Sequence, residues 1–441
     1  MNKFKIFLIK YIIIIKLNVC TSNIIRFPFS RNYLFQSIEG KFNHENLVFN
    51  DLIINLVVGS NHQTLPMSLR FSEYSLFIIG SDNTGNYTKF DEKKSETFRK
   101  KNDTLESFFF LPFKSAYDSN DDFFINDKKI NNMNFFLSID IDPQISKTTK
   151  AGMIGLNERY KKHKKEALLK NKNFINQLIE KKIISSYSFY FQYTEYDKGE
   201  FIIGGYPHEY DKNYNKNNYV ETKIQHFEEG SQWQILFDNI TYGDKSFSYR
   251  NKATINLEYG MIYSNQDYKA HVDKYFFIEQ LKINKCWSKQ VTLSKTSTNN
   301  FIYICDKDVN ISNVKPLKFI LKEINMTFEF DYHDLFELYD DKYYFMVLLR
   351  KNENIWNLGK PFFKKYTMVF DQDLKTIGFY DKNRIVPTNP FFFIKIIFLF
   401  ILIGILILLI YLIMKNKLMK KKRYKAKELD LDNDYSNLIF N

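Results

Sequence analysis

The chain has 441 residues, among them 44 Phe and 30 Tyr, and its formal net charge is +13. A chain of this length can bury a large core and form two or three domains. The positive charge is spread along the sequence, and there is neither zinc-finger spacing nor a basic recognition helix. We therefore predict no nucleic-acid partner, and we also predict no cofactor and no metal site.

The first 22 residues have the pattern of a secretory signal peptide. Early lysines precede an apolar stretch, and small residues follow at Cys20 to Ser22. Lys10 and Lys16 interrupt the apolar stretch, so an uncleaved membrane anchor is the alternative. We interpret residues 23–44 as a pro-like or linker segment.

Between the two ends of the chain, short runs rich in Ile, Phe, Tyr and Val alternate with Asn, Asp, Lys and Gly. This texture predicts strands and an all-β body with few short helices. The clearest helical periodicity covers Lys172 to Ile183, where apolar residues recur at helical spacing.

Cysteines and sequons fit a secretory ectodomain. Cys286 and Cys305 can pair as a disulfide in that compartment, with two unrelated buried thiols as the alternative. Five N-x-S/T sequons predict glycosylation at Asn86, Asn102, Asn239, Asn310 and Asn325.

A second apolar segment, Ile396 to Met414, contains no charged residue. About 20 apolar residues span a bilayer as a helix, and we predict a transmembrane helix over residues 392–414. The tail, residues 415–441, begins with a basic cluster that stays cytosolic by the positive-inside rule. The prediction is a single-pass type I membrane protein of the secretory pathway, at the cell surface or in endolysosomal membranes. In the tail, Tyr435 and Leu438 form the Y-x-x-apolar pattern that sorting adaptors read.

Residues 45–382 resemble the pepsin-like aspartic peptidase family. Six motifs stand in the family's order: "INLVVGSNHQTLPMSL", "FDEKKSETF", "AGMIGL", "GEFIIGGY", "SQWQILFDNITYGD" and "IWNLGKPFFKKYTMVFDQDLKTIGF". The resemblance implies a bilobal fold with an N-terminal β lobe over 45–225 and a C-terminal β lobe over 226–385. It also implies an interlobe cleft that accepts an extended peptide or protein, with one catalytic loop from each lobe.

The family's chemistry needs two close aspartates, each in a D-T-G or D-S-G triplet. The pair shares a proton, so that one carboxylate acts as base on a water and the other as acid. The sequence contains no such triplet. The resemblance places Arg70 at the first Asp position and Asn256 at the second. The flap departs too, because Tyr117 is followed by Asp118 and no Tyr-Gly pair occurs in that segment.

These departures predict a pseudoprotease without catalytic residues. Glu73 and Glu258 are a conceivable substitute dyad, but they stand at different offsets from the expected Asp positions, and we interpret them as surface or cleft-rim residues. An active aspartic-type endopeptidase with divergent active-site loops is the alternative function. A structural surface protein that uses the fold only as a stable body is the third.

Overall fold

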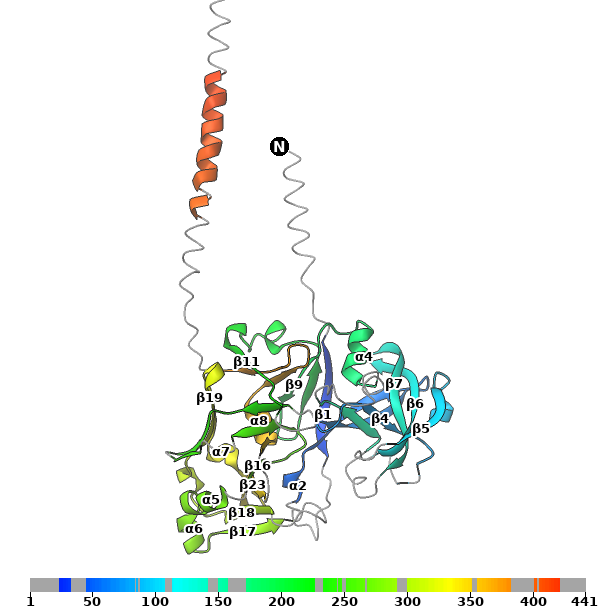
Figure 1. The fold of residues 1–441 in the computed structure, drawn as a ribbon, viewed down its shortest axis with the longest axis vertical. Coiled ribbons are helices and arrows are strands. Elements are labelled where there is room, and N and C mark those ends of the chain that lie inside the picture. The colour runs from blue at the N-terminus through cyan, green and yellow to red at the C-terminus, as the bar shows by residue number, and fades with distance from the viewer. Residues whose placement is uncertain are drawn as a thin grey trace, which may run out of the picture. The chain divides into compact units, whose positions relative to one another are not determined.

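The computed structural model describes residues 24–32, 45–83, 85, 88–107, 113–141, 150–157, 172–226, 233–243, 245–247, 251–265, 268–291, 300–350, 355–381, 400–402 and 404–420. The chain divides into two compact units, Met1–Lys382 and Asn383–Asn441. Strands dominate the first unit, so the prediction of an all-β fold with few short helices is confirmed (Figure 1).

A 13-stranded sheet extends through the first unit in the order β11-β26-β25-β9-β10-β1-β2-β3-β8-β4-β7-β6-β5. Its strands are β1 (Ile25–Asn32), β2 (Asp51–Val58), β3 (Gln63–Arg70), β4 (Leu76–Ile79), β5 (Arg99–Ser107), β6 (Phe113–Ile125), β7 (Lys128–Ile141), β8 (Gly152–Gly155), β9 (Ser188–Tyr193), β10 (Lys198–Ile203), β11 (Tyr219–Lys223), β25 (Met368–Asp371) and β26 (Thr376–Tyr380). The last two strands come from the C-terminal end of the body and join strands from its N-terminal half. The sheet therefore crosses the boundary between the two predicted lobes.

The remaining strands form a 9-stranded and a 4-stranded sheet. The larger sheet contains β12 (Gln234–Leu236), β15 (Lys252–Ile255), β24 (Trp356–Leu358), β16 (Ile262–Asn265), β23 (Val347–Arg350), β18 (Asn300–Asp306), β22 (Lys342–Phe345), β21 (Phe336–Tyr339) and β17 (Cys286–Val291). The smaller contains β14 (Lys245–Phe247), β13 (Asn239–Tyr242), β19 (Leu317–Leu321) and β20 (Met326–Phe330). In Figure 1, β4 to β7 lie on one side of β1 and β9, and β16 to β18 with β23 lie on the other.

Helices are short in the first unit. They are α2 (Glu45–Val48), α4 (Phe174–Glu180), α5 (Lys269–Tyr275), α6 (Ile278–Lys282), α7 (Tyr332–Leu335) and α8 (Lys360–Lys365), with single 3-10 turns at Glu92–Lys94, Pro207–Glu209, Lys216–Asn218, Ile311–Asn313 and Lys322–Ile324. Helix α4 lies inside the predicted Lys172–Ile183 stretch. Its N-cap is Asn173, whose side chain accepts from the Asn176 amide, and Lys182 beyond its end has a φ of 58°.

Residues 25–32 of the predicted pro-like or linker segment, 23–44, form strand β1 of the large sheet. It pairs with β10 from Ile25 to Ser30 and with β2 from Ser30 to Asn32. Its side chains alternate between buried and exposed, as in a strand with one face on the core. The strand was missed because its partners β10 and β2 lie farther along the chain, and no local signal specifies that pairing. Residues 33–44 lie outside the described part of the chain.

Aromatic rings join the floor of the first predicted catalytic loop to the end of the chain's body. The Phe71 ring centroid lies 5.2 Å from that of Phe370 on β25 and 5.7 Å from that of Phe363 on α8. Trp233 packs 5.1 Å from Phe370, and its indole donates to the Leu156 carbonyl oxygen at 2.8 Å. Such pairs each add about 0.5–1.5 kcal/mol beyond area burial. Phe363 and Phe370 of the C-terminal motif therefore pack against Phe71 and stabilise the first loop.

In the second unit, the described residues form the helix Phe400–Lys420, of 21 residues. Its length and apolar composition are suited to crossing a membrane. The helix extends beyond the predicted end at 414 into the first basic residues, up to Lys420. Residues 392–399 lie outside the described part.

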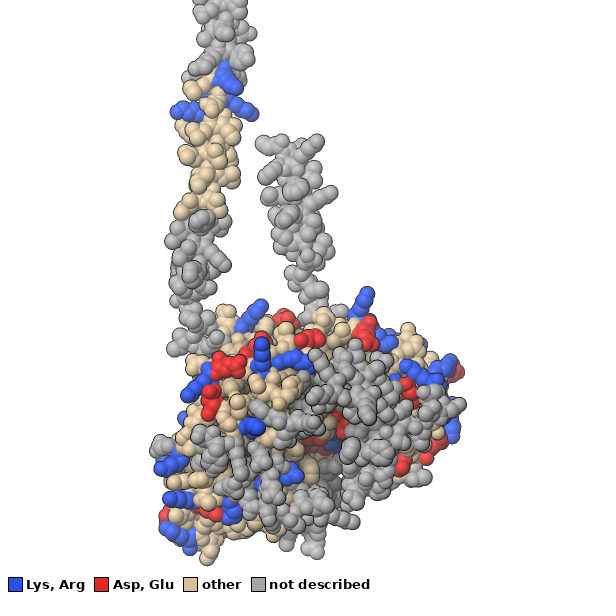
Figure 2. Space-filling view, in the orientation of Figure 1, with Lys and Arg blue, Asp and Glu red and all other residues tan. Residues whose placement is uncertain are grey.

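Charges are mixed over the face that Figure 2 shows. Among the described residues of the body, lysines and arginines are interspersed with aspartates and glutamates, whereas the charged residues of the helix Phe400–Lys420 are all basic.

Candidate functional site: the floor of the two catalytic-type loops

Two similar strand–loop–strand units form the centre of the first unit. In one, β3 pairs in parallel with β8, and β8 pairs antiparallel with β4. In the other, β15 pairs in parallel with β24, and β24 pairs antiparallel with β16. Arg70 ends β3 opposite Gly155, and Asn256 follows β15 one residue beyond the Ile255–Leu358 pair, at the level of Gly359. Arg70 and Asn256 are therefore equivalent positions in the two units.

Gly155 and Gly359 are needed because the backbone of a neighbouring loop packs directly against each of them. A Cβ on Gly155 would lie 2.3 Å from the carbonyl carbon of Tyr74, and one on Gly359 would lie 2.2 Å from the carbonyl oxygen of Tyr259. Both distances are below any van der Waals contact with backbone. The glycines thus fix the path of the two loops that follow Arg70 and Asn256.

Arg70 is held between two carboxylates. Its guanidinium lies 3.1 Å from Asp51 and 3.5 Å from Glu258, and its side chain is 12% exposed. Burial acts to lower the pKa of Arg70, but Asp51 and Glu258 outweigh it and raise that pKa. Burial also raises the pKa of Asp51, and Arg70 opposes this rise. Arg70 is thus the cation of a buried ion-pair cluster at the end of β3.

Glu258 joins the two loops. Its carboxylate accepts from the Ser72 amide at 2.6 Å and from the Ser72 hydroxyl at 3.2 Å. Its backbone carbonyl oxygen accepts a hydrogen bond from the backbone N–H of Asn50 at 2.8 Å. The side-chain amide of Asn50 donates to the Leu257 carbonyl oxygen. These bonds hold Glu258 to the opposite loop.

Asn256 turns its side chain into its own loop. Its Oδ1 accepts from the Glu258 amide at 2.9 Å, and the residue is only 4% exposed. An amide in this role stabilises a turn by satisfying a backbone donor. An amide also cannot cycle a proton as a carboxylate does at neutral or acid pH.

Glu73 is a half-buried carboxyl near the same cluster. Burial, together with the charge of Glu258, raises the pKa of Glu73 to about 8, while Arg70 opposes the rise. The negative charge of Glu258 therefore disfavours the ionised form of Glu73. Both residues are half-buried, and Glu258 contacts Arg70, so their position at a surface or cleft rim stays a prediction.

Sequence reasoning missed Asp51, the acidic partner at the start of β2. No spacing rule connects Asp51 to Arg70, because β2 and β3 become neighbours only in the hairpin. One signal was available: an arginine at a buried position requires a nearby carboxylate. Asp51 also accepts from the Asn32 side chain at 3.0 Å, which connects the cluster to β1.

The other predicted site residues lie away from this floor. Cys286 and Cys305 are disulfide-bonded across β17 and β18. Asn310 and Asn325 are exposed, Asn239 is half-buried, and Asn102 lies on β5. Asn86, Tyr435, Leu438 and residues 1–22 lie outside the described part of the chain. Tyr117 lies on β6, and the Nζ of Lys100 is 3.4 Å from its ring centroid; residues 108–112 lie outside the described part. Within the described ranges, no group of three His, Cys, Asp or Glu is arranged to hold a metal ion.

Comparison with known proteins agrees with this architecture. The family model described as eukaryotic aspartyl protease matches residues 53–382. No curated protein matches the chain. The matched region begins within β2, ends after β26, contains both strand–loop–strand units and covers well over half of the sequence. The chain belongs to the eukaryotic aspartyl protease family.

Proposed function

We propose that this family member is a membrane-anchored pseudoprotease whose interlobe cleft binds a peptide or protein without cutting it. The observation that best supports the absence of catalysis is that Arg70 and Asn256 occupy equivalent positions in the two strand–loop–strand units. Neither side chain can share a proton as the family's aspartates do. Arg70 is engaged by Asp51 and the Glu258 carboxylate, and Asn256 by the Glu258 amide, so both side chains have structural partners.

The proposed topology is a single membrane pass with the body in the lumen or outside the cell and a short cytosolic tail. The apolar helix Phe400–Lys420 and the basic residues after Met414 support it. Sorting through Tyr435 and Leu438, and an N-terminal signal peptide over residues 1–22, belong to the same proposal.

A proteolysis assay tests the inactive assignment. Purified full-length protein in detergent is incubated with a peptide library between acid and neutral pH, with and without pepstatin. We expect no cleavage above that of a boiled sample. Cleavage that pepstatin blocks would overturn the proposal.

An active endopeptidase with divergent loops is the second candidate, and Glu73 is the observation that favours it. Burial, and after it the charge of Glu258, raises the pKa of its carboxyl to about 8, and carboxyls perturbed in this way cluster at functional sites. The variants Glu73→Gln and Glu258→Gln decide between the two. Turnover that disappears in both variants supports the enzyme, whereas background signal unchanged in both supports the pseudoprotease.

Peptide binding is tested at the cleft floor itself. Ser72 is exposed between the two loops, so Ser72→Trp should obstruct a bound peptide and weaken its retention at least tenfold. Lys128→Trp, at the exposed β6–β7 turn, is the matched control and should bind as wild type does. Equal binding by both variants, or no retained peptide at all, would favour the purely structural role.

A further inference from the structure

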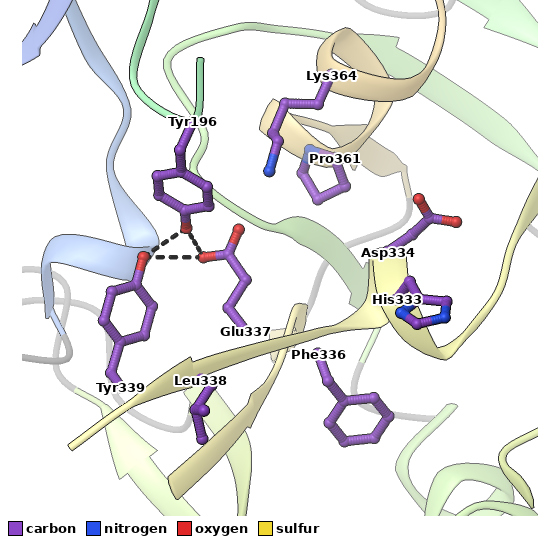
Figure 3. Close-up of a pocket in the computed structure, with 9 residues that line it drawn as sticks. All are labelled: Tyr196, His333, Asp334, Phe336, Glu337, Leu338, Tyr339, Pro361 and Lys364. Atoms are coloured by element: carbon purple, nitrogen blue, oxygen red, sulfur yellow. Dashed lines mark hydrogen bonds between the residues drawn. The ribbon is translucent and has the colours of Figure 1, made fainter. Parts of the chain in front are cut away.

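A pocket of about 430 Å³ lies in the second half of the body, apart from the Arg70 cluster. Three segments distant in sequence line it: the β9–β10 turn through Tyr196, α7 with β21, and α8. Figure 3 shows Tyr196, Tyr339 and Glu337 joined in a hydrogen-bonded triangle on one side, with Lys364 and Pro361 of α8 facing them. The volume lies within the range of small-molecule sites.

The wall around Tyr196 is rigidly held. The Tyr196 hydroxyl bonds to Glu337 and to Tyr339, and the Tyr339 hydroxyl donates to Glu337 Oε2 at 3.2 Å. Lys360, only 1% exposed, places its Nζ 3.4 Å from the Tyr196 ring centroid and 3.1 Å from Asp197. The aromatic ring and the carboxylate are thus oriented before any ligand arrives, which reduces the entropy cost of binding.

Two groups of opposite charge at this pocket lack full pairing within the described part of the chain. Glu337 Oε1 receives no hydrogen bond there, and the Lys360 ammonium lies 3.9 Å away. Lys364 has no carboxylate partner among those residues and only overlies the Tyr196 ring, at 4.2 Å. No ion pair joins Lys364 to Glu337. Lys365 differs, because it pairs with Asp334.

We propose that this pocket binds a small zwitterion of the α-amino-acid class. The ligand's ammonium bonds to Glu337 Oε1, and its carboxylate bonds to Lys364, whose flexible stem adapts to the spacing. The side chain of the ligand packs between Pro361 and the tyrosine rings. Phe336 and Leu338 lie on the opposite side of β21 from Glu337 in Figure 3, so they leave the charged side of the strand open.

Calorimetric titration of full-length protein in detergent tests the assignment on the wild type. The probes are glycine, L-leucine, N-acetyl-L-leucine and L-leucinamide. Leucine should bind at least tenfold more tightly than either capped form, because each cap removes one of the two charges. Absence of binding by both glycine and leucine at millimolar concentration, or equal binding of the capped forms, would overturn the proposal.

Two variants assign the charges to residues. Glu337→Gln should abolish the preference for leucine over N-acetyl-leucine, and Lys364→Met should abolish the preference over leucinamide. The matched controls are Glu329→Gln and Lys318→Met, which alter a surface ion pair of 2.9 Å on β19 and β20 in the same half of the body. Controls that lose the preferences, or pocket variants that keep them, would contradict the assignment. Failure here leaves the cleft proposal untouched, because the two experiments probe different residues.

Discussion

Arg70 is a buried cation held by two carboxylates at the end of β3. Its two partners come from different places in the chain: Asp51 precedes it on β2, and Glu258 belongs to the second loop. Asp51 has a side chain only 1% exposed, so its charge depends on the guanidinium for compensation. The cluster therefore holds the two loops together through charge.

Replacing Arg70 by Met should destabilise the protein by about 3–5 kcal/mol, because two partly buried carboxylates lose their common cation. The free energy of unfolding of the full-length protein in urea is the measurement. Arg26→Met is the control, since its pair with Glu200 is well exposed and worth about 1 kcal/mol or less. A loss in Arg70→Met no larger than in the control would show that the cluster does not stabilise the fold.

Glu73 should make stability depend on pH. Its pKa is raised from 4.5 to about 8 in the folded protein, so the folded state binds more protons than the unfolded state between these values. Its contribution is fully present below about pH 4.5 and is lost as the pH rises to about 8. Glu73→Gln should remove this decline, measured as urea midpoints at pH 5 and pH 8. Glu195→Gln, on an exposed carboxylate, should keep the wild-type profile. Parallel profiles for wild type and Glu73→Gln would refute the assignment.

At the scale of elements, the sequence predicted what depends on local pattern. Alternating apolar residues and the glycines of "AGMIGL" and "IWNLGK" are local signals, and they led to the all-β fold and to the family. The contacts of Arg70 depend instead on tertiary pairing, which brings β2, β3 and the second loop together. Strand β1 was missed for the same reason: its register comes from β10, more than 160 residues later in the chain.

The β17–β18 hairpin should depend on its disulfide. Among the described strands, β17 pairs only with β18, and Cys286 lies directly opposite Cys305. The bond closes a loop with a sequence separation of 19, which is worth about 3 kcal/mol on the chain-entropy model. Cys286→Ala with Cys305→Ala should lower the free energy of unfolding by that amount. Reduced wild type should match the double variant, and a loss below about 1 kcal/mol would contradict the prediction.

At the scale of the whole molecule, the proposed topology places the body and the tail on opposite sides of a membrane. Glycosylation reports on this directly, because the glycan acceptors must face the lumen. Asn310 and Asn325 are exposed. Asn310→Gln and Asn325→Gln should each increase gel mobility by one step, and a glycosidase should collapse wild type and both variants to one band. An epitope placed after Asn441 should be detected only in permeabilised cells. A body without glycans, together with a tail accessible from outside, would show the opposite topology. That result would contradict the orientation that the basic residues after Met414 predict.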